Sequence, residues 1–189
     1  MNISKVREIL SALSIKPSKK RGQNFLFDNN TINKIIDFAD LDYNLPVIEI
    51  GPGLGALTEV LSDKSKLFSV IELEEQFAKR ISVEFPKIKV FNQDILNFSL
   101  ESLIEGNETG NIQIISNLPY SISSPVIFWL IDNSTHIKEA TLLLQREFAE
   151  RIATQPGNRN TGIPSVILSL IADVSLGPIV GKKVFFPEP

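Results

Sequence analysis

The sequence feature that most constrains the fold is the stretch from Glu49 to Thr58, which reads Glu-Ile-Gly-Pro-Gly-Leu-Gly-Ala-Leu-Thr. Residues 46–50 form a short apolar run typical of a strand, and apolar residues recur at helical spacing after the glycines. Gly51, Gly53 and Gly55 permit positive φ and place no Cβ in the way of a ligand. The following helix is expected to present free N–H groups and a positive dipole end. The stretch therefore predicts a strand-to-helix turn that holds a polar cofactor against the backbone.

Strand and helix patterns alternate along the rest of the chain. Strands are expected at residues 46–50, 67–71, 88–92, 112–116, 140–144 and 174–180. Helical patterns surround residues 3–13, 32–39, 56–61, 77–83, 125–131 and 148–152, and residues 166–174 are ambiguous between helix and strand. This alternation predicts an α/β fold with a mostly parallel, twisted sheet and helices on both faces.

Polar side chains follow several of these strands. Ligands bind past the carboxyl ends of the strands in such sheets, so these side chains are candidate ligand contacts. Glu72, after the second strand, can accept hydrogen bonds from both ribose hydroxyls of an adenosine-containing cofactor. Asp94, after the third, can accept from an adenine amine, although a helix cap before Ile95 is the competing interpretation. Asn117 ends the fourth strand.

Asn117, Leu118, Pro119 and Tyr120 form the motif for the acceptor substrate. It resembles the Asp/Asn-Pro-Pro-Tyr motif of enzymes that methylate exocyclic amines of nucleobases. The lone pair of an adenine amine is delocalised into the ring. The side-chain oxygen of Asn117 and the carbonyl of Leu118 can both accept from that amine and favour a pyramidal nitrogen. Tyr120 can stack on the target base; an ordinary turn after a strand is the alternative.

Composition excludes several other classes of protein. With 43% hydrophobic and 22% charged residues, the chain can bury a full core. It has no cysteine and a single histidine, His136, so neither thiol chemistry nor a metal is expected. Apolar runs are too short to span a bilayer, and no signal peptide is evident, which predicts a cytoplasmic protein.

The net charge of −3 argues against a uniformly basic nucleic-acid binder but permits a local basic face. Lys16, Lys19, Lys20 and Arg21 are the candidate RNA-binding cluster, with a solvated arm as the alternative. Residues 1–21 are accordingly expected to form an N-terminal helix and basic arm, and residues 22–189 a catalytic domain.

The glycine spacing distinguishes between cofactors. The dinucleotide fingerprint is G-x-G-x-x-G, whereas this chain has G-x-G-x-G with Ala56 following. An acidic residue followed by G-x-G-x-G resembles the first motif of S-adenosylmethionine (SAM) methyltransferases, with Glu49 in the acidic place. A nicotinamide-dependent dehydrogenase is the rival enzyme class.

Six motifs occur together and in order, and with them the chain resembles the ribosomal RNA adenine N6-dimethyltransferases of the kasugamycin-resistance type. The motifs are Gly22-Gln23-Asn24-Phe25-Leu26, the glycine stretch, Val70-Ile71-Glu72-Leu73, Gln93-Asp94, Asn117-Leu118-Pro119-Tyr120-Ser121-Ile122-Ser123 and Phe185-Phe186-Pro187-Glu188-Pro189. The resemblance implies a Rossmann-like fold, SAM as cofactor, and dimethylation of two adjacent adenines near the 3′ end of 16S rRNA in the small ribosomal subunit. It also implies a monomer.

The resemblance further implies roles for individual residues. Asn24 and Leu26 would contact the methionine end of SAM. Gly51 and Gly53 would lie against the cofactor. Glu72 would hold the ribose, Asp94 the adenine, and Asn117 would link cofactor to acceptor amine. Phe185, or its neighbour Phe186, would face Tyr120 across the flipped base.

Two departures from the family pattern qualify this picture. The usual Tyr-Gly-Arg-Leu-Ser run is replaced by Thr161-Gly162-Ile163-Pro164-Ser165. The sequence also stops inside the last motif, before the family's seventh, antiparallel strand and C-terminal helical domain, which indicates a truncated chain in which Phe185 is poorly held. A large-subunit methylase of the macrolide-resistance type and a non-catalytic pre-rRNA-binding assembly factor are the alternative functions.

Overall fold

A computed structural model of the chain describes residues 1–18, 22–100, 103, 111–155, 157–158 and 161–189. Its α-helices are α1 (Ile3–Ala12), α2 (Asn29–Ala39), α3 (Thr58–Lys64), α4 (Glu75–Glu84), α6 (Ser123–Asp132), α7 (Arg146–Ile152) and α8 (Ile163–Ile171). Its strands are β1 (Phe25–Leu26), β2 (Val47–Ile50), β3 (Phe68–Ile71), β4 (Lys89–Phe91), β5 (Ile112–Asn117), β6 (Ile137–Leu143) and β7 (Phe185–Phe186). Short 3₁₀ turns are η2 (Ile95–Asn97), η3 (Tyr120–Ile122), η4 (Ser134–His136) and η5 (Lys182–Val184).

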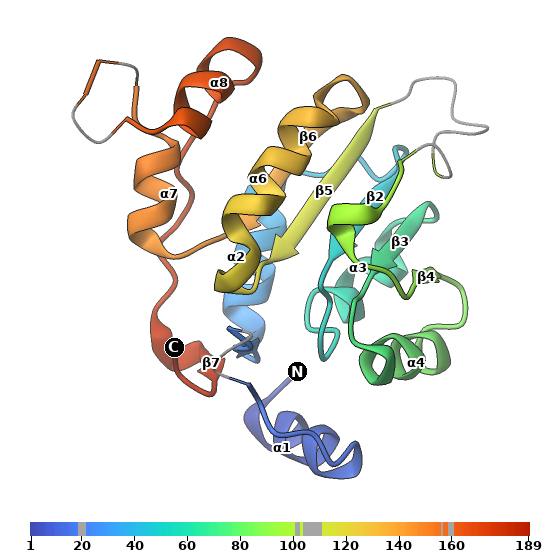
Figure 1. Ribbon diagram of the computed structural model, residues 1–189. Coiled ribbons are helices and arrows are strands. Elements are labelled where there is room, and N and C mark those ends of the chain that lie inside the picture. The colour runs from blue at the N-terminus through green and yellow to red at the C-terminus, as the bar shows by residue number, and fades with distance from the viewer. Residues whose placement is uncertain (19–21, 101–102, 104–110, 156, 159–160) are drawn as a thin grey trace.

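The main sheet contains five parallel strands in the order β4-β3-β2-β5-β6. The chain runs outward from β2 to β4 and then returns to the other side of β2, so the order reverses between β2 and β5. Open α/β sheets bind ligands at such a reversal, beyond the carboxyl ends of the strands. In Figure 1 the arrowhead of β5 points toward the end of the molecule where β1, β7 and α1 lie. The predicted fold class is confirmed.

Helices cover both faces of this sheet, because successive strand residues alternate between two buried layers. One layer packs α2, α3 and α4 against the sheet; its strand residues are Val47, Phe68, Val70 and Ile115. The other packs α6 and η2 against the sheet; its strand residues are Ile48, Ile50, Ile71, Ile112 and Ile114. Asp28 caps the start of α2, because its side chain accepts a hydrogen bond from the Thr31 N–H at 2.8 Å.

A second, two-stranded sheet joins the two ends of the chain. β1 pairs antiparallel with β7, with Phe25 opposite Phe186 and Leu26 opposite Phe185. Phe185 is only 7% exposed and belongs to the buried layer that contains Leu26. The expectation that Phe185 is poorly held is therefore wrong, because β1 supplies the pairing that the sequence pattern did not reveal.

Helix α1 packs onto the elements that follow it. Val6 and Leu10 are buried in a small cluster with Phe25, Leu54 and Phe77. The N-terminal helix thus shares a core with β1 and the glycine loop.

Two further differences concern the second half of the chain. Residues 174–180, expected as a strand, are irregular and largely exposed, with Ile179 at 78%. The β-branched side chains of these residues favoured a strand. A strand forms only where it can pair with another strand, and residues 174–180 pair with none of the described strands. The ambiguous residues 166–174 lie mostly in α8.

Candidate cofactor and acceptor site

The glycine loop occupies the connection from β2 to α3. Gly51, Gly53 and Gly55 have φ of 65°, 53° and 75°, a region that strains other residues. A Cβ on Gly55 would lie 2.7 Å from Cδ1 of Ile81, so α4 packs directly against the loop. The helix begins only at Thr58, later than the sequence pattern indicated. A backbone N–H of the loop itself, that of Gly53, therefore points toward a buried acid.

That acid is Glu72, which follows β3. Its two carboxylate oxygens accept from the backbone N–H of Gly53 at 2.9 Å and of Glu74 at 2.8 Å. The side chain is buried, and burial raises the pKa of Glu72 while these backbone hydrogen bonds oppose the shift. The buried carboxylate therefore places hydrogen-bond acceptors at the carboxyl end of β3. This position adjoins β2, where the strand order reverses.

A second buried acid, Glu49, lies on β2 beneath the loop. It is 2% exposed and accepts a hydrogen bond from the hydroxyl of Thr58 at 2.6 Å. Burial raises the pKa of Glu49 to about 8; the Thr58 bond opposes the shift and the Glu72 charge adds to it. At neutral pH Glu49 is therefore mainly the neutral acid, whose role is to hold the start of α3 against β2.

The acceptor motif lies directly beside the glycine loop. The side-chain N–H of Asn117 donates to the carbonyl of Asn24 at 3.2 Å. A Cβ on Gly22 would lie 2.8 Å from the backbone nitrogen of Tyr120, so residues 22–24 pack closely on the motif. The bond to Asn24 uses the donor end of the Asn117 amide and leaves its oxygen as the acceptor that can meet an amine. Burial raises the pKa of Tyr120, which keeps its phenol neutral.

One cavity of about 80 Å³ brings the predicted residues together. Its lining includes Asn24, Leu26, Gly51, Gly53, Glu72, Asn117, Leu118, Pro119 and Tyr120. Residues 22–26 form one wall of this cavity, and the glycine loop forms another.

Two predicted site residues lie outside this cavity. Asp94 accepts from the N–H of Leu96 at 3.0 Å and caps η2, which is the interpretation that competed with adenine binding. Phe185 lines a larger, open groove with Asn117 and Tyr120. The predicted RNA-binding residues Lys19, Lys20 and Arg21 lie outside the described residues.

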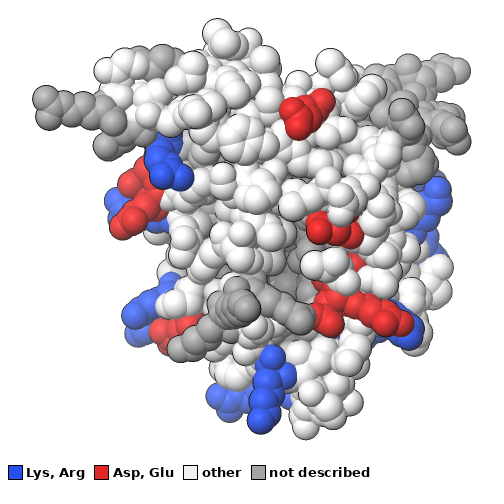
Figure 2. All heavy atoms as spheres, in the orientation of Figure 1, with Lys and Arg blue, Asp and Glu red and all other residues white. Residues whose placement is uncertain are grey.

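Sequence reasoning missed some residues around the site. Phe77 lines the cavity and meets Phe25 edge-on, with ring centroids 5.7 Å apart, although periodicity indicated only a core residue. Lys182 and Lys183 are exposed on η5, immediately before β7, and Lys182 lines the open groove. The sequence feature that could have identified these two lysines is their position shortly before the Phe-Phe-Pro motif. Figure 2 shows further basic side chains at the lower end of this face, where α1 lies.

Neither a metal centre nor a membrane span is found in the part of the chain that the structure describes. There, no set of three His, Asp or Glu side chains is grouped closely enough to coordinate a metal ion. None of the helices in the described ranges is both long and apolar enough to cross a membrane.

A parallel sheet in this order, with a glycine loop after β2 and an acid after β3, defines the class of Rossmann-like methyltransferases. The family described as Ribosomal RNA adenine dimethylase matches residues 15–189. The chain belongs to this family.

Curated relatives agree with this assignment. Ribosomal RNA small subunit methyltransferase A of Prosthecochloris aestuarii is 40% identical over 99% of this chain and 70% of its own length. The protein of the same name in Chlorobaculum tepidum is 41% identical over 93% of this chain and 62% of its own. The chain thus spans about two thirds of the length of these relatives.

Solved structures give the same fold. The 23S rRNA methyltransferase ErmE has a TM-score of 0.74 and 29% identity, covering 88% of this chain and 65% of its own. A dimethyladenosine transferase from Plasmodium falciparum also has a TM-score of 0.74 and 29% identity, covering 87% of this chain and 59% of its own.

Proposed function

We propose that this chain contains the catalytic domain of a SAM-dependent enzyme that dimethylates N6 of two adjacent adenines near the 3′ end of 16S rRNA. The observation that carries the proposal is the cavity in which the Asn117–Tyr120 motif meets the glycine loop and Glu72. Cofactor-binding and amine-binding groups have to converge for methyl transfer, because the reacting atoms must be held in line.

Cofactor binding is assigned to the glycine loop and its neighbours. Bound SAM supplies an electrophilic methyl group on a sulfonium and leaves as a neutral thioether. Glu72 accepts from the ribose hydroxyls, and Gly51 and Gly53 allow close approach of the backbone. Asn24 and Leu26 form the wall at the methionine end. Asp94 is proposed to reach the adenine through the carboxylate oxygen that does not cap η2.

Acceptor activation is assigned to Asn117 and Leu118. The Asn117 side-chain oxygen and the Leu118 carbonyl accept the two N–H groups of the adenine amine, which frees the nitrogen lone pair to attack the methyl carbon. As the new N–C bond forms, the bond between the sulfonium sulfur and the methyl carbon breaks, and one amine proton passes to solvent water. Tyr120 stacks on the base, and Phe185 in the adjoining groove faces it from the other side. Each of these groups acts by position and electrostatics.

The choice of the small subunit follows from the relatives. The curated relatives at 40–41% identity are small-subunit methyltransferases, whereas the 23S rRNA methyltransferase structure is 29% identical. The nicotinamide-dependent alternative lacks support, because the matching family and the curated relatives are methyltransferases. We further propose that the protein is a monomer that needs no metal and acts in the cytoplasm, where subunits are assembled.

The test is methyl transfer itself. Labelled SAM is incubated with immature small subunits and the chain, and the methylated bases are mapped. We expect label on two adjacent adenines of 16S rRNA, and a strongly reduced rate of labelling with Asn117→Ala. Label on 23S rRNA instead would favour the macrolide-resistance type, and binding of subunits without any label would favour an assembly factor. A chain extended to the length of the relatives is measured in parallel.

A further inference from the structure

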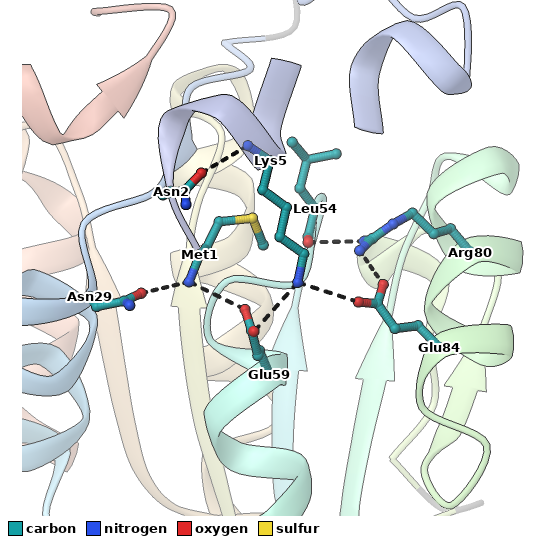
Figure 3. Close-up of polar contacts among 8 residues, drawn as sticks. All are labelled: Met1, Asn2, Lys5, Asn29, Leu54, Glu59, Arg80 and Glu84. Carbon is teal, nitrogen blue, oxygen red and sulfur yellow. Dashed lines mark hydrogen bonds and ion pairs between the residues drawn. The ribbon is translucent and has the colours of Figure 1, made fainter. Parts of the chain in front are cut away.

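Arg80 on α4 does not line the cavity, but it holds the glycine loop at Leu54. The Leu54 side chain is 2% exposed and packs with Phe25 and Phe77. Its carbonyl accepts a hydrogen bond from Nη1 of Arg80 on α4 at 2.9 Å (Figure 3). Leu54 lies between Gly53 and Gly55, so this bond acts on the middle of the loop.

Arg80 is itself fixed by a chain of charges that crosses three helices. Its guanidinium pairs with Glu84 one turn further along α4. Glu84 also lies 3.7 Å from Nζ of Lys5 on α1, and Lys5 lies 3.4 Å from Glu59 on α3. Figure 3 shows these contacts running from α4 through α1 to α3. The Arg80 side chain is 14% exposed, and its planar group is engaged on one side by a carboxylate and on the other by the loop.

The bond to Leu54 determines the direction of the neighbouring N–H groups. The Leu54 carbonyl and the Gly55 N–H belong to one planar peptide unit. The Gly55 N–H donates to the Pro52 carbonyl at 2.8 Å and closes the turn that contains Gly53. The Gly53 N–H in turn donates to Glu72 at 2.9 Å. Arg80 is therefore connected, through the Leu54–Gly55 and Pro52–Gly53 peptide units, to the loop and the acid assigned to the cofactor.

We propose that Arg80 is a positioning residue for SAM, which it does not touch, and that it sets affinity by holding the glycine loop in its binding shape. The inference rests on the proposed function, because SAM is the ligand concerned. Arg80 was not singled out by the sequence, since an arginine on an amphipathic helix usually faces solvent.

The experiment compares Arg80→Met with Lys79→Met. Lys79 is the adjacent residue on α4 and has the same kind of ion pair, with Glu75, but its side chain is 74% exposed and lies away from the loop. SAM affinity is measured by calorimetry on the 189-residue chain. Removal of a charge-assisted hydrogen bond predicts about tenfold weaker binding for Arg80→Met. Lys79→Met should bind as the wild type does.

Hydrogen exchange supplies a readout that a general loss of stability would not move. Residues 51–57 should exchange faster in Arg80→Met without SAM, while the central strands β2 and β5 keep their protection. If Arg80→Met does not fold, Arg80→Lys provides the test. Lysine keeps the positive charge but cannot contact the Leu54 carbonyl and the Glu84 carboxylate at the same time. Its affinity for SAM should lie between that of the wild type and the tenfold weaker value expected for Arg80→Met. Wild-type affinity in the Arg80 variants overturns the inference alone. Absence of SAM binding by the wild type overturns the proposed function and the inference with it.

Discussion

The carboxylate of Glu72 accepts a hydrogen bond from the backbone N–H of Gly53 at 2.9 Å, so the acid that follows β3 is tied to the loop that follows β2. Gly53 and Glu72 are distant from each other in the sequence. The parallel register of β2 and β3, with Ile50 opposite Ile71, brings both strand ends to the same edge. The residues of the proposed cofactor site are thus brought together by the order of strands in the sheet.

Glu72→Gln should weaken SAM binding. The amide retains one acceptor but places an N–H₂ toward the N–H of Glu74 or Gly53, and it loses the negative charge that favours ribose hydroxyls. Hydrogen bonds to charged groups contribute roughly 1.5–3 kcal/mol, or about tenfold to a hundredfold in affinity. Calorimetry with SAM and with NAD measures this, with the exposed Glu75→Gln as control. Micromolar binding of NAD without a response to SAM would overturn the cofactor assignment.

Asn117→Ala should lower methyl transfer by roughly 10²–10³ while SAM affinity changes little. The deleted oxygen acts on the acceptor amine, whereas the cofactor is held mainly by the glycine loop and Glu72. Turnover is measured in a chain extended to the length of the relatives, and cofactor affinity in both lengths. Near-normal turnover would show that Asn117 only ends a strand and orders Asn24.

Glu49 predicts an unusual pH dependence of stability. The unfolded chain loses the Glu49 proton near pH 4.5, whereas burial delays the loss in the folded chain to about pH 8. Between these values the folded state holds more protons, so the contribution of Glu49 to the free energy of unfolding falls as pH rises. Glu49→Gln, which mimics the neutral acid, should therefore stabilise the protein more at pH 8 than at pH 5. Denaturant unfolding at both pH values checks this; an equal difference at both would contradict it.

RNA binding should depend on the basic cluster near the N-terminus. Lys19→Gln/Lys20→Gln should weaken binding and reduce the slope of log affinity against log salt by about 0.9 for each phosphate that is no longer neutralised, the value for a duplex. Lys66→Gln/Lys87→Gln is the matched control, because these exposed lysines precede β3 and β4 and thus lie at the amino ends of the strands, away from the glycine loop and Asn117. An equal effect of both pairs would mean that only net charge matters.

Much of the fold, and the grouping of the candidate site residues around one cavity, could be predicted because the signals are local. The Val47–Ile50 run and the glycines specify a strand and a turn through side-chain pattern and permitted φ. Glu72 and Asn117 then follow strands whose carboxyl ends must share one edge. The residues that line the cavity from β2, β3 and β5 were accordingly named from the sequence.

The errors concern features that depend on distant partners. Residues 174–180 have strand composition but pair with no described strand, and composition alone does not reveal that. Phe185 appeared loose because its partner, Leu26, lies at the other end of the sequence. The sequence indicated a surface position for Arg80. Its partner is the backbone carbonyl of Leu54, and since every residue type has such a carbonyl, no side-chain pattern reveals the contact.

The pairing of β1 with β7 has a consequence for synthesis. The amino-terminal end of a chain leaves the ribosome first, and domains begin to assemble as they emerge. Strands β2 to β5 and the glycine loop can associate while the last segment is still inside the ribosome. Leu26, which forms one wall of the cavity, gains its antiparallel partner only when Phe185 has emerged. Cofactor capture during translation is therefore expected late, and a nascent chain that ends before Phe185 should hold SAM poorly even though its central sheet is complete.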